Sequence, residues 1–299
     1  MNNRNTLTGI SLAIIATLIW SGNFIVARGI VKTIPPISLA FYRWVLATII
    51  LLPFIGNFFK IGWPQVKERF LFFLVAAATG VSLFNTLVYI GGHYSEAINL
   101  ALIGTTSSPI MSVILAVVFL KERISWIRII GMLICVVGVL FLLIKGDINN
   151  LFQLSFSTGD WWVLAAAFSF AIYNTMVKKK PASMPSTHFL FALFILGTVL
   201  LLPFYIYEYI TVGSFKPSLA NVSILLYLGI GASVVCFLLW NIAIAKLGSG
   251  RAALFGNLIP IFSSIEAVLI LGEKVSWIQV TSFVIVIIGL VIANLQKRN

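Results

Sequence analysis

The sequence contains few charged residues. Asp, Glu, Lys and Arg make up 9% of its 299 residues, while hydrophobic types make up 60%, and the mean hydropathy is +1.07. A soluble domain carries about 25% charged residues because its surface faces water. A chain with so little charge cannot cover a globule of this size with polar side chains. Soluble folds are therefore excluded, and most of the surface must face lipid.

Cysteine and histidine are also scarce. Cys135 and Cys236 both lie inside apolar runs, and His93 and His188 are far apart in the sequence. This argues against a disulfide framework and against a Cys or His metal cluster. The HExxH, GxSxG and Walker GxxxxGK[ST] patterns are absent as well. We therefore expect neither an ATP-driven pump nor an enzyme, and we expect no cofactor and no metal.

Long, continuous apolar runs predict membrane-spanning helices. A helix needs about 20 apolar residues to cross about 30 Å of hydrocarbon. The first run follows Arg4 and is predicted to be a retained helix rather than a cleaved signal sequence. We expect an all-α integral membrane protein with ten transmembrane helices. The ten runs are 7–29, 37–56, 70–91, 96–120, 125–145, 160–179, 186–207, 221–245, 250–271 and 276–296.

Lys and Arg are distributed unevenly between the predicted loops. Ten spans place both termini on one side, and the opposite side would hold only Arg28, Lys32, Lys145, Lys216 and Lys274. Basic residues accumulate in cytoplasmic loops, so we expect both termini in the cytoplasm of a bacterial inner membrane. This topology accounts for the net charge of +12 without a nucleic-acid partner.

The two halves of the chain resemble each other. A shift of 151 residues aligns Pro109 with Pro260, Glu122 with Glu273, Trp126 with Trp277 and Gly138 with Gly289. A shift of 150 aligns Phe41 with Phe191, Thr48 with Thr198 and Pro53 with Pro203. Because each half contains five spans, an odd number, the second half must cross the membrane in the opposite sense. We expect 1–150 and 151–299 to form two inverted five-helix repeats around a central cavity, an arrangement typical of secondary transporters.

Several motifs carry a family resemblance. The first predicted helix contains Trp20-Ser21-Gly22-Asn23-Phe24 and the second contains Phe41-Tyr42-Arg43-Trp44, while each half ends with Pro, then Glu, then a late Gly. This pattern resembles the EamA family of the drug/metabolite transporter superfamily. The resemblance implies a basket of ten helices whose helices 1, 3, 4, 6, 8 and 9 line the cavity. It also implies transport of amino acids, related metabolites or toxic analogues.

The second half departs from the first at two of these places. Phe170 stands where the first half has Trp20, and Leu193 stands where it has Arg43. The roles of Trp20 and Arg43 are therefore expected in one half only.

These features predict a secondary transporter that exports small neutral or zwitterionic metabolites by alternating access. The alternative is a proton-coupled exporter of drugs or toxic compounds, and a membrane-embedded enzyme is less favoured. The first span, Leu7 to Val26, contains no acid. Antiport of hydrophobic cations through an acid in that helix is therefore disfavoured. The expected partners are a small-molecule substrate and the lipid bilayer.

Polar and aromatic side chains in the middle of the spans are the candidate substrate-binding residues. Polar groups are costly in lipid, so they face the interior of a bundle or a cavity. Their alternative role is hydrogen bonding between helices. The candidates are Trp20, Asn23, Phe24, Asn85, Tyr89, Thr105, Tyr173, Asn174, Trp240, Asn241 and Asn257.

Two charged residues inside the spans and two glycines leave alternatives open. Glu266 would carry protons that couple transport, or it would be a neutral Glu bonded to a neighbouring helix. Arg43 would snorkel outward or pair with a buried acid, and a structural role is favoured over substrate binding. Gly131 and Gly138 permit close helix packing, either within the chain or in a homodimer.

Overall fold

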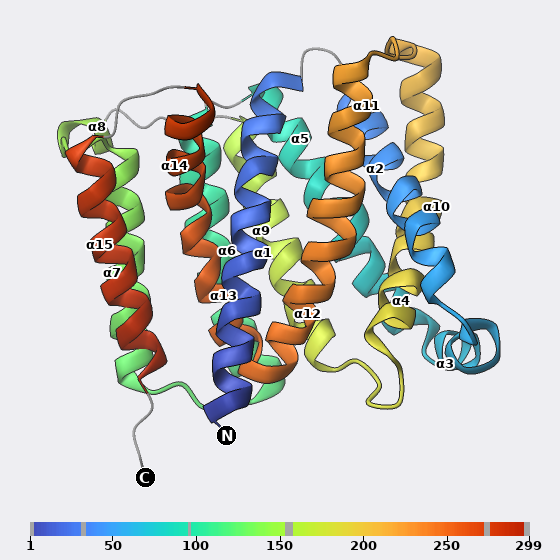
Figure 1. The fold of residues 1–299 in the computed structure, drawn as a ribbon, viewed down its shortest axis with the longest axis horizontal. Helices are drawn as coiled ribbons and strands as arrows, with labels where there is room; N and C mark the ends of the chain where they lie inside the picture. Colours follow the sequence, from blue (N-terminus) through green and yellow to red (C-terminus); the bar gives the residue numbers. More distant parts are fainter. Residues whose placement is uncertain (1–2, 31–33, 95–96, 153–157, 272–275, 296–299) are drawn as a thin grey trace.

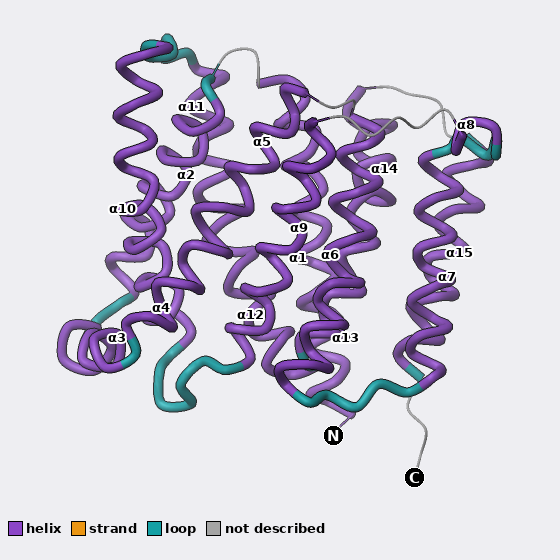
Figure 2. The backbone as a smooth tube through the Cα atoms, turned by 180° about the vertical axis from the view of Figure 1, so that it is seen from behind, coloured by secondary structure: helices purple, strands orange, loops and turns teal. Residues whose placement is uncertain are grey.

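The structure is a computed structural model that describes the chain except residues 1–2, 31–33, 95–96, 153–157, 272–275 and 296–299. Within the described ranges all regular elements are helical (Figures 1 and 2). The helices are aligned roughly side by side, and α1 begins at the same end of the molecule at which α15 ends (Figure 1). An all-α architecture is therefore confirmed.

The helices of the first half follow the predicted runs closely. Residues 70–94 form one long rod, α4–η3–α5, and the break expected near residues 60–69 is itself largely helical. The elements are α1 (Asn3–Ile30), α2 (Pro36–Leu51), η1 (Leu52–Phe54), η2 (Phe58–Gly62), α3 (Trp63–Glu68), α4 (Phe70–Ala77), η3 (Ala78–Leu83), α5 (Phe84–Tyr94), α6 (Ala97–Leu120), α7 (Trp126–Leu143) and α8 (Asn149–Phe152).

The second half has a similar succession of helices. The predicted eighth run is α11–η4–α12, and the ninth is α13–η5–α14. The elements are α9 (Thr158–Lys178), α10 (Ser186–Val212), α11 (Leu219–Leu226), η4 (Tyr227–Val235), α12 (Cys236–Leu247), α13 (Ser249–Ala253), η5 (Leu254–Leu258), α14 (Ile259–Leu271) and α15 (Trp277–Asn294).

The described residues contain 6 helices that are long and apolar enough to cross a membrane. Many of their large apolar side chains are exposed, among them Leu71, Ile210 and Leu219. An outer surface of this kind suits lipid rather than water. The chain is therefore a multi-pass membrane protein. The six spans are Arg4–Gly22, Pro36–Phe54, Phe70–Gly91, Ser186–Val212, Leu219–Leu247 and Trp277–Asn294.

Helices α7 and α15 form an antiparallel pair that depends on glycine. A Cβ atom on Gly131 would lie 2.4 Å from the backbone nitrogen of Ala293, and one on Gly289 would lie 2.7 Å from the backbone nitrogen of Cys135. One on Gly138 would meet Val286 at 2.9 Å. As the residue numbers of the contacts increase along α7, those of their partners on α15 decrease, so the two helices are antiparallel. Gly131 and Gly138 thus pack within the chain, so these glycines give no support to a homodimer.

The start of α2 is held by a buried acid of α10. Glu208 is 6% exposed. Its carboxylate accepts hydrogen bonds from the backbone N–H groups of Ile37 (3.1 Å) and Ser38 (2.6 Å) and from the Ser38 hydroxyl (2.7 Å). These N–H groups belong to the first turn of a helix and have no partner within it. Glu208 therefore acts as a cap supplied by a neighbouring helix.

We expect Glu208→Ala to destabilise the protein by about 2 kcal/mol, because it leaves charge-assisted bonds to the first turn of α2 unmade. The measurement is the melting temperature in detergent, which should fall by roughly 5 °C. Glu68→Ala removes an exposed acid and is the control, with no resolved change expected. Equal melting temperatures for the two variants would contradict the capping role.

Candidate functional site

Two helical rods of the bundle contain a π-helical segment. The elements η3 and η4 are π-helical segments within otherwise α-helical rods. Such segments are rare and often occur at functional sites because they displace backbone groups from their usual partners. Neither was predicted. A signal existed in the sequence, since a shift of 151 residues aligns Gly80-Val81-Ser82 with Gly231-Ala232-Ser233.

Arg43 is the centre of a buried polar cluster. Its side chain is 1% exposed. Nε donates to Ser233 Oγ at 2.6 Å, Nη1 donates to Asn85 Oδ1 at 2.8 Å and to Tyr89 Oη at 3.0 Å, and Nη2 donates to the Ala232 carbonyl at 3.0 Å. All four acceptors are neutral. The expectation that Arg43 snorkels outward or pairs with an acid is therefore wrong, because π-helix η4 and helix α5 supply neutral oxygens around it.

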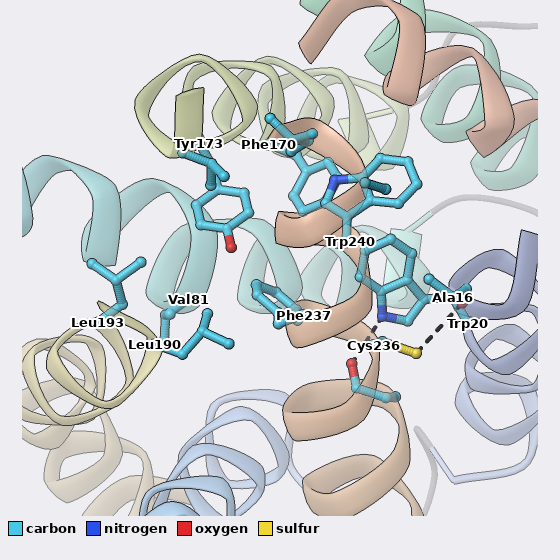
Figure 3. Close-up of a cluster of buried hydrophobic side chains, with 14 of the residues drawn as sticks. Ala16, Trp20, Val81, Phe170, Tyr173, Leu190, Leu193, Cys236, Phe237 and Trp240 are labelled. Carbon is cyan, nitrogen blue, oxygen red and sulfur yellow. Dashed lines mark hydrogen bonds between the residues drawn. The ribbon is translucent and has the colours of Figure 1, made fainter. Parts of the chain in front are cut away.

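Four large aromatic side chains lie against this arginine cluster. Trp20 of α1 packs against Phe170 (ring centroids 5.7 Å apart), Phe237 (5.7 Å) and Trp240 (5.0 Å). Figure 3 shows these rings converging from α1, α9 and α12. Trp20 Nε1 donates to the Ala232 carbonyl at 2.8 Å, the same oxygen that Arg43 uses. The aromatic cluster (Trp20, Phe170, Phe237 and Trp240) and the arginine cluster therefore share an atom.

Two asparagines extend the network toward α6 and α9. Trp240 Nε1 donates to Asn174 Oδ1 at 2.8 Å, and Asn174 Nδ2 donates to Ser112 Oγ at 3.0 Å. Tyr173 Oη donates to Asn241 Oδ1 at 2.6 Å. These side chains are nearly all fully buried. The candidates of α9 and α12 are thus joined to one another rather than dispersed through the bundle.

Glu266 lies at the contact between α14 and α1. The Ser21 hydroxyl donates to its Oε1 at 2.7 Å. Its Oε2 is buried and has no hydrogen-bond partner in the described part of the chain. A Cβ on Gly22 would lie 3.7 Å from that oxygen and 2.5 Å from the hydroxyl of Tyr227. The absence of a side chain at residue 22 therefore leaves room for the acid and the phenol.

The structure brings most of the predicted site residues together. Trp20, Asn85, Tyr89, Tyr173, Asn174, Trp240 and Asn241 belong to the clusters above. Asn257 stands apart: it is buried in η5 and its Nδ2 donates to Leu254 of its own turn at 2.9 Å. The side chains of Asn23, Phe24 and Thr105 lie outside the described residues.

Several members of the network were not predicted as site residues. Ser112, Ser233, Ser21 and Tyr227 supply hydroxyl groups, and the Ala232 carbonyl accepts two bonds. A short hydroxyl side chain carries no distinctive pattern in an apolar run.

The arrangement is suited to binding rather than to covalent chemistry. In the ranges that the structure describes, no three His, Cys, Asp or Glu side chains gather as a metal site. The network instead offers aromatic faces beside amide, hydroxyl and guanidinium donors. Pockets for small molecules typically combine an apolar wall with a few oriented polar groups.

Comparison with known proteins agrees with this description. The model of the EamA-like transporter family matches twice, at residues 7–144 and 157–295. An uncharacterized transporter of Archaeoglobus fulgidus is 27% identical over 296 residues, which cover 98% of this chain and 99% of the relative. A probable amino-acid metabolite efflux pump of Escherichia coli K12 is 25% identical over 292 residues, covering 94% and 93%.

A solved crystal structure shares the fold. It superposes with a TM-score of 0.77 at 16% sequence identity, and the match covers 98% of this chain and 97% of the other. The two matches to the family model cover most of the sequence, each over about half of it. The members of this family are transporters rather than enzymes. Such transporters act on small molecules within a lipid bilayer. The chain therefore belongs to the EamA-like transporter family.

Proposed function

We propose that this protein is a secondary transporter that exports amino acids or related zwitterionic metabolites across the bacterial inner membrane by alternating access. The observation that carries the proposal is the buried network formed by the arginine and aromatic clusters. It joins residues of both halves of the chain, from α1 and α2 to α9 and α12. Relatives named as amino-acid metabolite efflux pumps support the substrate class.

If the two halves are inverted repeats, they can exchange conformations, and the network between them would then open to one side of the membrane or to the other. The pairing of α7 with α15 supports the inversion, because the contact between Cys135 and Gly289 is mirrored by that between Gly138 and Val286 under the 151-residue shift. Trp44 and its counterpart Phe194 also face each other, with ring centroids 4.9 Å apart. Both contacts are those expected about a two-fold axis in the membrane plane.

The proposed topology has ten spans, with residues 1–150 and 151–299 as the two repeats. Both termini would lie in the cytoplasm. The start of α1 and the end of α15 at one end of the molecule support this (Figure 1). Near that end, Lys246 Nζ donates to Asn5 at 3.1 Å, and Arg251 contacts Asn294. Basic side chains at this end suit a cytoplasmic face.

Proton coupling through Glu266 is part of the proposal. Glu266 is an acid on α14 that contacts α1 through Ser21, and α1 also supplies Trp20 to the aromatic cluster. Protonation of the acid would change its bonding to α1. This helix would then link the proton and the substrate.

The experiment that tests the function is transport by the purified protein in liposomes. We expect at least one of the twenty common amino acids to exchange across the membrane without chemical change, and to accumulate when a proton gradient is imposed. Liposomes without protein are the control. If the folded protein transported none of the amino acids, the proposed function would be wrong. Movement of cationic drugs instead would favour the drug exporter.

A conservative change in the aromatic cluster should slow transport. Trp240→Phe keeps an aromatic side chain, although a smaller one, and removes the N–H that donates to Asn174. Leaving a buried amide oxygen unpartnered costs about 1–3 kcal/mol, so we expect a decrease in transport rate of roughly tenfold. Trp277→Phe alters a Trp that is 66% exposed and is the control. Equal rates for both variants would argue against a role for the cluster in transport.

A further inference from the structure

We propose that Arg43 and Asn85 bind the carboxylate of the transported amino acid. The inference rests on the proposed function and identifies the group by which the protein would recognise its substrates. It predicts that a free carboxylate is required, whereas the amide of the same amino acid is transported poorly.

Arg43 carries a charge that is costly to bury. Arg43 is 1% exposed and lies within the bundle. Burying a guanidinium is expensive unless a counter-ion compensates it. Its four hydrogen-bond acceptors are two side-chain hydroxyls, one amide oxygen and one backbone carbonyl. These acceptors satisfy hydrogen bonds of the guanidinium, but none of them carries a negative charge.

The second half of the chain provides an internal comparison for Arg43. Leu193 occupies the position of Arg43 in the second half. It is 0% exposed, and Figure 3 draws it with Val81 and Leu190 among the buried apolar side chains. The same place in the architecture is therefore filled by an apolar residue. Helix packing alone does not call for a cation at this position.

The guanidinium of Arg43 is surrounded by further hydrogen-bond donors. Asn85 is 2% exposed. Its oxygen accepts from Arg43, while its Nδ2 has no partner among the described residues. Tyr89 and Ser233 likewise meet Arg43 with their oxygens, so their own protons are further donors. A site that is cationic and rich in donors is complementary to an anionic acceptor, and guanidinium binds carboxylate strongly.

The neighbouring aromatic cluster provides the second half of an amino-acid site. The Ala232 carbonyl joins Arg43 to Trp20, whose ring contacts Phe170, Phe237 and Trp240. A carboxylate held by Arg43 would leave the side chain of the amino acid near these rings. Apolar side chains are therefore expected to be favoured.

The experiment compares each transported amino acid with its own amide in liposomes. For the wild-type protein we expect the free acid to be preferred roughly 10- to 100-fold, the range for charge-assisted hydrogen bonds. Asn85→Asp places a carboxylate beside Arg43 and competes with the substrate. We expect this preference to fall at least about tenfold, while the melting temperature is maintained or raised. Thr48→Val, also on α2, removes a hydroxyl that bonds its own helix and should change neither quantity.

The outcomes separate this inference from the function on which it rests. Equal transport of acid and amide by the wild type would overturn the inference and leave amino-acid transport intact. A stabilised Asn85→Asp protein with unchanged preference would also overturn it, because Arg43 would then be structural. Transport of no amino acid would remove the proposed function itself. The wild-type comparison stands even if a variant does not fold.

Discussion

Replacing Glu266 by Gln is expected to reduce proton-driven accumulation of substrate to the level of liposomes without protein. The carboxyl of Glu266 can exchange a proton, and the amide of Gln cannot. The amide oxygen can still accept the hydrogen bond that Ser21 donates at 2.7 Å, so the contact between α14 and α1 is preserved. Exchange of substrate without a gradient should therefore continue. The measurement is accumulation with and without an imposed pH difference.

A second buried acid provides the matched control for this substitution. Glu208 is 6% exposed, but it caps α2 and lies outside the network of Trp20 and Ser21. Glu208→Gln keeps an oxygen that accepts from α2 and should retain gradient-driven accumulation. Full accumulation by the Glu266→Gln protein would show that protons are coupled elsewhere or not at all.

The positions of the helices could be predicted from the sequence because apolar runs of sufficient length have one stable form in lipid. Within the described residues, helices lie where the apolar runs predicted them, with ends that differ by a few residues; α10 continues to Val212, beyond the predicted end at 207. The extension has a simple reason. Its last turns carry Tyr207 and Tyr209 with Glu208, an amphipathic stretch that suits the edge of the membrane.

The environment of each site residue could be predicted only in part. Burial of Asn85, Tyr173 and Trp240 follows from the cost of polar groups in lipid. Their partners do not follow, because Trp20 and the Ala232 carbonyl are 212 residues apart. The π-helical geometry of η4 was not predicted either, since a π-turn depends on packing as well as on a local pattern such as the repeated Gly-x-Ser. The neutral surroundings of Arg43 are a consequence of that turn.

The largest effect on stability is expected from Gly131→Ala in α7. The added methyl group would lie 2.4 Å from the backbone nitrogen of Ala293 and 2.6 Å from the carbonyl oxygen of Gly289. Backbone atoms cannot rotate away, so α7 and α15 must separate along their whole contact. Overpacking of this kind costs about 3 kcal/mol. We expect the melting temperature in detergent to fall by roughly 10 °C.

Gly231→Ala is the matched control because it makes the same substitution where there is room. Its new methyl group would come no closer than 3.6 Å to a neighbour. Ala is favoured over Gly inside a helix by about 0.5–1 kcal/mol, so the melting temperature should hold or rise. A fall of the melting temperature for Gly131→Ala, with no fall for Gly231→Ala, would show that the loss of stability arises at the α7–α15 contact. A stable Gly131→Ala protein would contradict the close approach of the two helices, and with it the symmetry argument for inverted repeats.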